Sequence, residues 1–325
     1  MKQNIKKIKM GRKFSLSYDE YTSLRHRRYI GFNLHENECK KTYKTGLIRT
    51  YGSCPAENLT QNIKVHLNSF GVCMERDVVG STQDGAAINK KLMQLTDIVD
   101  QLCFNHAIHL GVCDTLYKKN KDINVPAPKE TDSDSEEDEH GIYNDNFSFE
   151  SVNNEINVVY PKILINVRKV VKFIKMSSVR NQIFQKKVTE EFGKEIELHL
   201  DVCHRWNSLF SMTAPLLKTK KCLFQTSTEL NALGVINKLD FESLASLHAV
   251  LEPAKLAVEF LSREDATFST ADTVLKFILS KLFAMNTEIA SLLHSNLKKR
   301  IDKRINGNVM QLLKCLKVAP SVVPL

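Results

Sequence analysis

Three short segments near the N-terminus alternate apolar and polar side chains with a period of two residues. They are residues 13–19 (KFSLSYD), 29–35 (YIGFNLH) and 45–52 (TGLIRTYG). Such alternation is typical of β-strands that bury one face, and gaps of about ten residues are typical of hairpins. The sequence therefore predicts an antiparallel meander of three strands at the start of the fold.

A helix and a fourth strand follow the meander. Pro55 opens a segment with apolar side chains at helical spacing, and Gly71 is placed to end it. Residues 77–82 (DVVGST) then form an apolar run that predicts a strand buried on both faces. Because a helix connects this strand to the meander, we expect it to lie parallel to its neighbour. This order of elements matches the opening of an RNase H-like α/β fold.

The remainder of the chain predicts helices, with no convincing strand after Gly85. Residues 98–119, 160–177 and 240–262 carry apolar side chains three and four positions apart, the pattern of amphipathic helices. Pro253 is expected to kink or divide the last of these.

Another helix is expected from STADTVLKFILSKLF, where Ser269 and Asp272 have the spacing of a capping box. Val274, Phe277, Ile278 and Leu282 form its predicted buried stripe.

An acidic block separates the two halves of the chain. Seven acids lie between Glu130 and Glu139, and such a run repels itself and cannot build a core. We therefore predict a disordered linker there. The expected organisation is a basic tail (1–12), a partial RNase H-like domain (13–120), the linker (121–149) and a helical domain (150–325).

The composition of the chain limits the kinds of partner that the protein is expected to bind. The net charge is +9, and basic residues cluster in 1–13 and 298–304, which favours an anionic partner such as nucleic acid. Eight scattered cysteines suit a reducing compartment, nucleus or cytoplasm. No run approaches the ~18 apolar residues of a membrane span, so we expect no membrane partner.

Asp19 and Asp84 are the candidate metal ligands. Asp19 ends the first predicted strand and Asp84 follows the fourth, and in an RNase H-like sheet those strands are neighbours. Two carboxylates at one sheet edge could hold Mg²⁺ or Mn²⁺, which can activate a nucleophile for phosphodiester cleavage. The alternatives are a cap or turn at Asp19 and an Asx turn at Asp84.

Two further groups of side chains are candidates for ligand binding, a Cys/His cluster and an adjacent Arg–Trp pair. Cys103, His106, His109 and Cys113 resemble metal ligands, but one continuous helix cannot close a zinc site without further ligands such as Cys203 or His204. The alternative is a packed, hydrogen-bonded helix face.

Trp206, beside Arg205, could stack on an unpaired base while the guanidinium holds phosphate, or it could anchor a helix junction in the core.

Taken together, these segments resemble the hAT superfamily of DNA transposases, in the branch related to BED-type zinc-finger proteins. The resemblance spans roughly residues 13–280. The segments that carry it, in order, are FSLSYDEYTS, RRYIGFNLH, LIRTYGSCPAENL, VVGSTQDGAAINKK, CFNHAIHL, DVCHRWNSLFSM and LEPAKLAVEFLSREDATFSTAD. It implies an RNase H-like domain interrupted after its fourth strand by a long helical insertion.

The resemblance also implies roles for single residues. Asp19 and Asp84 match the first two acids of an Asp-Asp-Glu triad that binds Mg²⁺ or Mn²⁺. Cys103 and His106 match a CxxH motif. Arg205 and Trp206 match an RW motif whose tryptophan stabilises a flipped base beside the cut.

The departures from the family pattern are equally specific. No segment resembling the one that carries the third acid is found, Gln83 replaces a common Thr, and no BED finger precedes residue 13. We therefore expect a C-terminally truncated sheet that lacks its final strand and the dimerisation region.

The expected function is that of a catalytically inactive, transposase-derived nuclear protein that retains nucleic-acid binding. Two alternatives stay open. One is an active transposase completed by a downstream segment or a partner chain, and the other is a helical protein-interaction module, for instance in a homo-oligomer.

Overall fold

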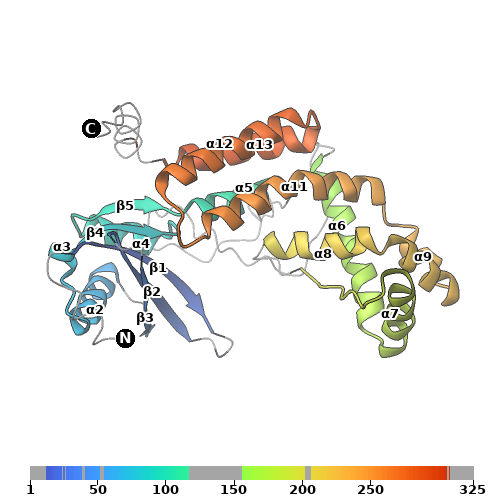
Figure 1. The fold of residues 1–325 in the computed structure, drawn as a ribbon, viewed down its shortest axis with the longest axis horizontal. Helices are drawn as coiled ribbons and strands as arrows, with labels where there is room; N and C mark the ends of the chain where they lie inside the picture. Colours follow the sequence, from blue (N-terminus) through green and yellow to red (C-terminus); the bar gives the residue numbers. More distant parts are fainter. Residues whose placement is uncertain are drawn as a thin grey trace, which may run out of the picture.

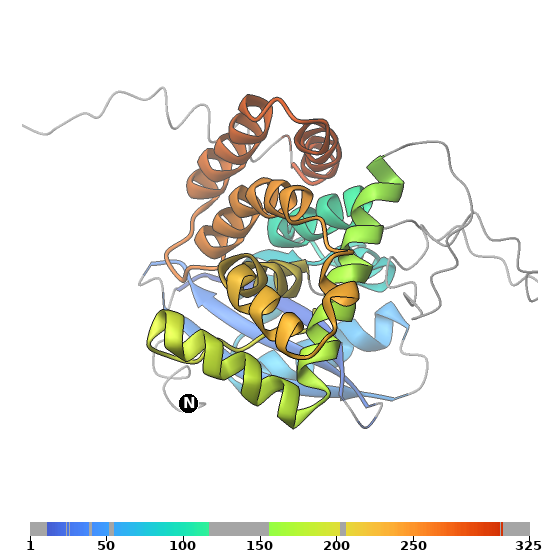
Figure 2. The same ribbon diagram turned by 90° about the vertical axis from the view of Figure 1, so that its right-hand side faces the viewer.

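The computed structural model describes residues 12–23, 25, 27–38, 41–51, 55–116, 156–201, 206–305 and 307. A mixed sheet with short helices lies at one end of an elongated molecule (Figure 1). Helices from the second half of the chain form the rest, some of them stacked beside the sheet (Figure 2). The predicted linker, residues 121–149, and most of the basic tail lie outside the described residues.

The sheet has five strands in the order β3-β2-β1-β4-β5. β1 (Phe14–Thr22), β2 (Arg28–Glu36) and β3 (Thr42–Thr50) are the predicted antiparallel meander. β4 (Val78–Gln83) lies parallel to β1, as the crossover helix requires. The topology is compatible with an RNase H-like fold.

Three expectations about the strands are wrong. β1 continues beyond Asp19, which pairs with Gly31 inside the ladder and is neither a strand end nor a cap. β4 is not buried on both faces, because Val79 and Thr82 are exposed.

The third error is the missing strand. β5 (Val99–Leu102) follows β4 and pairs parallel to it, so the expectation of no strand after Gly85 is wrong. The helical region therefore follows a fifth strand rather than the fourth. β5 is short and lies at the sheet edge with Val99 more than half exposed, so neither face imposes a hydrophobic pattern on its sequence.

One face of the sheet is buried against α2 (Ala56–Ser69). Pro55 precedes this helix, and Gly71 follows it in the left-handed conformation (φ +78°), both as the sequence predicted. The core between them is built from alternate residues of the strands and the apolar stripe of α2. These include Phe14, Leu16, Tyr18, Phe32, Leu34, Leu59, Ile63 and Leu67. The short helices α3 (Met74–Asp77) and α4 (Ala87–Gln94) flank β4.

The helical region has its own core. Its helices are α5 (Phe104–Leu116), α6 (Ile156–Lys175), α7 (Ser178–Phe192), α8 (Trp206–Lys218), α9 (Lys220–Glu229), α10 (Leu233–Ile236), α11 (Phe241–Leu261), α12 (Phe268–Ala284) and α13 (Glu288–Asp302). Buried residues of α5 belong to this helical core, although α5 directly follows the sheet in sequence. Within the described residues, no helix combines the length and the hydropathy needed to span a membrane.

Two details of the helices differ from the prediction. α11 runs through Pro253 without a break, so that proline does not divide it. α12 begins earlier than expected, since the hydroxyl of Thr267 accepts a hydrogen bond from the backbone N–H of Thr270 and is the N-cap in place of Ser269. Phe277 is about half exposed rather than buried.

α13 returns to pack on α5 at close range. A Cβ added to Gly111 of α5 would lie 2.6 Å from the Cδ2 atom of Leu297, so only glycine allows this approach. Beside it, the Arg300 guanidinium donates two hydrogen bonds to the Asp114 carboxylate, at 2.6 and 2.9 Å. This contact joins segments almost two hundred positions apart and brings the end of α13 to the sheet.

Candidate functional site

Parallel pairing of β1 and β4 brings the two predicted acids side by side, near the carboxyl end of β4. Ser17 lies opposite Thr82, and Asp19 and Asp84 each follow two positions later. Neighbouring strands lie about 4.8 Å apart, so the two residues stand at the same level of adjacent chain segments. Both line a cavity of about 850 Å³.

The same cavity is also lined by three residues of the predicted Cys/His cluster. Cys103 and His106 line it together with His109. Cys103 is held beside the acids because its backbone N–H donates to the carbonyl oxygen of Gln83, 2.7 Å away. The structure thus brings together four of the six residues to which the family resemblance assigns roles: Asp19, Asp84, Cys103 and His106.

The Asp84 carboxylate is part of a local turn. Its Oδ1 atom accepts hydrogen bonds from the backbone N–H of Ala86 and from the Nδ2 of buried Asn89, both at 2.9 Å. The first of these is the bond of an Asx turn. The next residue, Gly85, has φ +104°, a conformation that side chains other than glycine rarely adopt. The Asx-turn interpretation is therefore correct. The turn places Asp84 in the lining of the cavity.

A cation from the far end of the described chain also reaches this turn. Arg304, just beyond α13, donates from Nη1 to the backbone carbonyl oxygen of Asp84 at 2.8 Å. Burial raises the pKa of the Cys103 thiol, while the positive charge of Arg304 opposes that rise and the negative charge of Asp19 adds to it. Arg304 was noted only as the last residue of the basic cluster 298–304, and nothing in that cluster indicates a contact with Asp84.

Tyr18 is a second residue that sequence reasoning assigned only to the core. Burial, followed by the negative charges of Asp100 and Asp84, raises the pKa of its hydroxyl. The hydroxyl oxygen is buried and has no hydrogen-bond partner among the described residues. Asp100 itself accepts hydrogen bonds from Ser81 and Gln83, at 2.7 and 2.9 Å, which ties β5 to β4 behind the acids.

The donor set fits a divalent metal only in part. Asp19 and Asp84 supply carboxylate oxygens, the ligand type that Mg²⁺ and Mn²⁺ prefer. Within the part of the chain that the structure describes, no three His, Cys, Asp or Glu side chains converge as metal ligands. The described residues therefore do not form a complete metal site beside the two acids.

The Cys/His residues of α5 form a packed helix face. Cys113 is buried with its sulfur 3.7 Å from Nε2 of His109, and the rings of His106 and His109 are 5.8 Å apart. Cys203 and His204, the further ligands considered from sequence, lie outside the described residues. What the structure does describe favours the packed-face interpretation over a closed zinc site.

Trp206 begins α8 with its indole in the helical core, where it is 4% exposed. That burial corresponds to the core-anchor alternative, since stacking on a base requires an accessible ring. Arg205, the other half of the predicted pair, lies outside the described residues.

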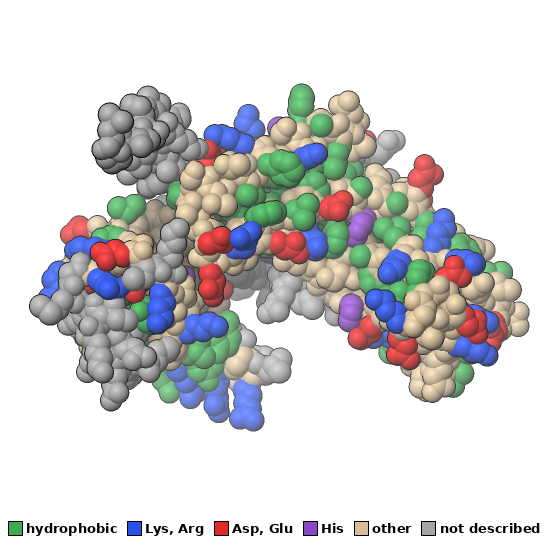
Figure 3. All heavy atoms as spheres, viewed as in Figure 1, with side chains coloured by type: hydrophobic (Ala, Val, Ile, Leu, Met, Phe, Trp, Pro, Cys, Tyr) green, Lys and Arg blue, Asp and Glu red, His purple; other side chains and the backbone are tan. Residues whose placement is uncertain are grey.

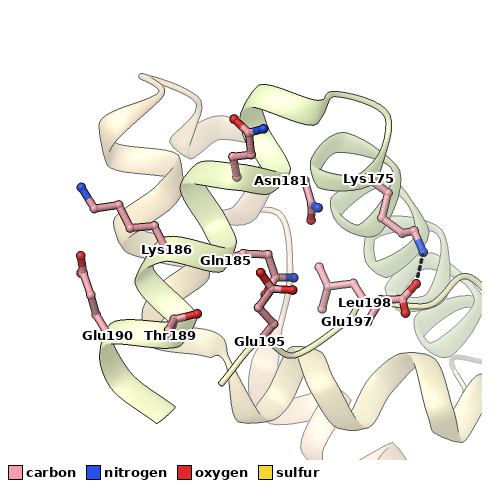
Figure 4. A pocket seen from close by; sticks show the side chains of 10 residues that line it. Lys175, Asn181, Gln185, Lys186, Thr189, Glu190, Glu195, Glu197 and Leu198 are labelled. Atoms are coloured by element: carbon pink, nitrogen blue, oxygen red, sulfur yellow. Dashed lines mark hydrogen bonds and ion pairs between the residues drawn. The ribbon is translucent and has the colours of Figure 1, made fainter. Parts of the chain in front are cut away.

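A second cavity, of about 800 Å³, lies in the helical region between α7, the end of α6 and the segment that follows α7 (Figure 4). Its lining mixes both charges, and Lys175 pairs with Glu197 at 3.0 Å across one side. Gln185 makes hydrogen bonds to both the N–H and the carbonyl oxygen of Ile196, which pins the segment to α7. None of the predicted site residues lines this cavity.

The comparisons with known proteins concern this helical region. Residues 151–250 match a family model. It is described as the ZBED1 RNase-like helical domain. The match covers α6 to α10 and the first part of α11, and it supports a transposase-derived protein related to the hAT and ZBED group. No curated protein matches the chain.

Proposed function

We propose that this chain is a nucleic-acid-binding protein derived from a hAT-type transposase, acting in the nucleus without cutting DNA. The observation that carries the proposal is the cavity at the edge of β1 and β4. It unites Asp19, Asp84, Cys103 and His106, which are far apart in sequence and correspond to the acids and the CxxH motif of that family. The family match over residues 151–250 is independent support.

Two contacts argue against strand cleavage at this edge. Oδ1 of Asp84 already accepts two hydrogen bonds in its turn, and the Arg304 guanidinium lies against the same turn. Phosphodiester cleavage by this kind of centre depends on carboxylates that hold two metal ions between them. These contacts compete with a metal ion for Asp84, so we expect the protein to bind nucleic acid without cutting it.

The basic character of the chain supplies the attraction for nucleic acid. The net charge of +9 gives a long-range field that favours a polyanion, and exposed Lys and Arg side chains contribute to it at the sheet end of the molecule (Figure 3). Binding of this kind releases counterions, so it weakens steeply as salt increases.

The test is a salt titration of the full chain with a fluorescently labelled DNA duplex, read by anisotropy in EDTA and again in Mg²⁺. We expect the logarithm of the binding constant to fall linearly with the logarithm of salt, by about 0.9 per phosphate contact. Binding should persist in EDTA and be no tighter in Mg²⁺, because the proposed binding needs no metal and Mg²⁺ itself competes for the phosphates. An undetectable or salt-independent interaction would contradict the nucleic-acid role and leave the protein-interaction alternative.

A further inference from the structure

The face of the sheet that α2 leaves uncovered carries a row of aromatic and cationic side chains. In the strand register, Tyr21 of β1 lies opposite Tyr29 of β2, which lies opposite Arg49 of β3. Residues directly opposite one another project from the same face of a sheet. The next row along the strands begins with Asp19 and ends with Leu47, so the aromatic row lies immediately beside the candidate acid.

These side chains are exposed or half-buried, and they already contact one another. The rings of Tyr21 and Tyr29 stack with centroids 5.3 Å apart and planes 15° from parallel. Tyr51, which follows β3, is 70% exposed, and the Arg49 guanidinium lies 4.5 Å from its ring centroid. Tyr21 is exposed and Tyr29 is half-buried, and tyrosines stacked in this way offer a flat surface to another ring.

Cationic side chains lie on or near this surface, next to the acidic end of β1 and β4. Arg25, Arg27 and Arg49 are exposed, and no ion pair among the described residues engages them. Arg28 is the exception, because it pairs with Glu20 at 2.5 Å. Lys and Arg side chains gather at this end of the sheet next to hydrophobic ones, a class that includes tyrosine in Figure 3.

We propose that this tyrosine–arginine surface (Tyr21, Tyr29, Arg49 and Tyr51) binds the unpaired bases of a single-stranded nucleic acid that runs past the Asp19–Asp84 edge. The nucleic-acid class rests on the proposed function, and the single-strand specificity is new. Bases stack on tyrosine rings whatever their sequence, and arginine holds the phosphates. In a duplex the same base faces are covered by their neighbours.

The distance from Tyr21 to Asp19 suits a single strand of nucleic acid. Tyr21 and Asp19 are two positions apart on β1, which is about 7 Å at ~3.3 Å per residue. Stacked nucleotides rise about 3.4 Å each, so roughly two of them bridge from the tyrosine row to the acid. The lining of the acid cavity includes Tyr21 and Leu47, which makes the two sites continuous.

The experiment compares two fluorescein-labelled probes of equal length with the full chain. One is oligo(dT), and the other is an abasic strand that keeps the phosphates but has no bases. The variants are Tyr21→Ser, Tyr51→Ser and Arg49→Gln, with Tyr21→Leu as a milder change that keeps apolar area in the strand. The matched control is Phe277→Ser with Lys281→Gln, an exposed ring with a lysine 5.5 Å from its centroid on α12.

We expect each tyrosine-to-serine variant to weaken oligo(dT) binding roughly tenfold and to leave abasic binding unchanged, since only stacking is lost. Arg49→Gln should weaken both probes and reduce the salt slope by about one. The control pair should bind both probes as the unchanged protein does.

Three results would overturn the inference: oligo(dT) bound no more tightly than the abasic strand, tyrosine variants that bind like the unchanged protein, or a control pair that loses as much as they do. If duplex binding nonetheless shows its salt dependence, the proposed function survives and only the single-strand surface is wrong. If neither DNA form binds, both fail.

Discussion

Arg304 and Asp84, 220 positions apart, are joined by a hydrogen bond of 2.8 Å from the guanidinium to the backbone carbonyl oxygen of the acid. The Gln101 side chain supports the contact by donating to the carbonyl oxygen of Arg304 at 2.9 Å. The end of α13 therefore fixes the turn that presents Asp84 to the cavity, and the helical region stabilises the candidate site in the sheet.

Replacing Arg304 should loosen that turn. Arg304→Ala removes a charged donor to a partly buried carbonyl group, which we expect to lower the free energy of unfolding by about 1–2 kcal/mol. Urea denaturation measures this loss of unfolding free energy. Arg263→Ala is the control, because its ion pair with Asp265 is exposed and contributes about 0–1 kcal/mol. Equal losses in the two variants would show that the Arg304 contact does not stabilise the fold.

Any side chain larger than that of glycine at position 111 should destabilise the fold. Gly111→Ala places a methyl group against Leu297, whose Cα atom would be only 3.2 Å away, so α13 itself must shift. We expect a loss of about 1–3 kcal/mol in the free energy of unfolding.

Gly234 in α10 is the matched position, because nothing lies within 4 Å of its added Cβ. Gly234→Ala should be neutral or stabilise by up to about 1 kcal/mol through helix propensity. A stable Gly111→Ala protein would contradict the close packing of α5 on α13.

The pattern of apolar and polar residues along the chain predicted most strands of the sheet, but it did not predict the edge strand β5. Phe14, Leu16 and Tyr18 alternate because β1 buries one face, so their sequence carries the period of a strand. β5 has no such face to bury, and its pairing with β4 through backbone hydrogen bonds leaves no trace in residue type. The same limit applies to Arg304, whose contact depends on how α13 packs and not on its neighbours in sequence.

The start of α12 offers a sharper comparison, because two cap signals lie two residues apart. The structure makes Thr267 the N-cap, so Thr267→Ala should cost about 1 kcal/mol of unfolding free energy. Ser269→Ala should change it by less than about 0.5 kcal/mol, because that residue lies inside the helix. Thermal or urea unfolding of both variants decides the point, and the reverse ranking would restore the capping box expected from sequence.

Stability should fall in mild acid partly through His35. Burial lowers the pKa of this imidazole from its ordinary 6.5, with Glu264 acting in the opposite direction. Below about pH 6.5 the unfolded chain takes up a proton that the folded chain does not, so the free energy of unfolding decreases as the pH falls towards the folded-state pKa.

His35→Gln removes that proton uptake. The variant is expected to be less stable at neutral pH, since Nε2 of His35 lies 2.8 Å from the Ser17 hydroxyl, but to lose less stability between neutral pH and about pH 5. Urea midpoints across the range give the slope. Part of the slope should remain, because burial also lowers the pKa of His248. An unchanged slope would show that His35 does not contribute.

For the candidate site, sequence order and strand adjacency located Asp19 and Asp84 but not their surroundings. The parallel pairing of β1 and β4 was enough to bring the two acids together. Whether Trp206 is buried depends on how the helices pack around it, which is why the sequence left both alternatives open. The structure places its indole in the core.

The most direct test of the account is DNA cleavage by the full chain under conditions in which binding is verified. A duplex with a single-stranded tail is incubated with Mg²⁺ or Mn²⁺, and bound complexes and nicked products are resolved side by side. We predict a shifted complex and no metal-dependent nick, in the unchanged protein and in Asp84→Asn alike. A nick that needs metal and disappears in Asp84→Asn would contradict the account, and the protein would then be an active nuclease.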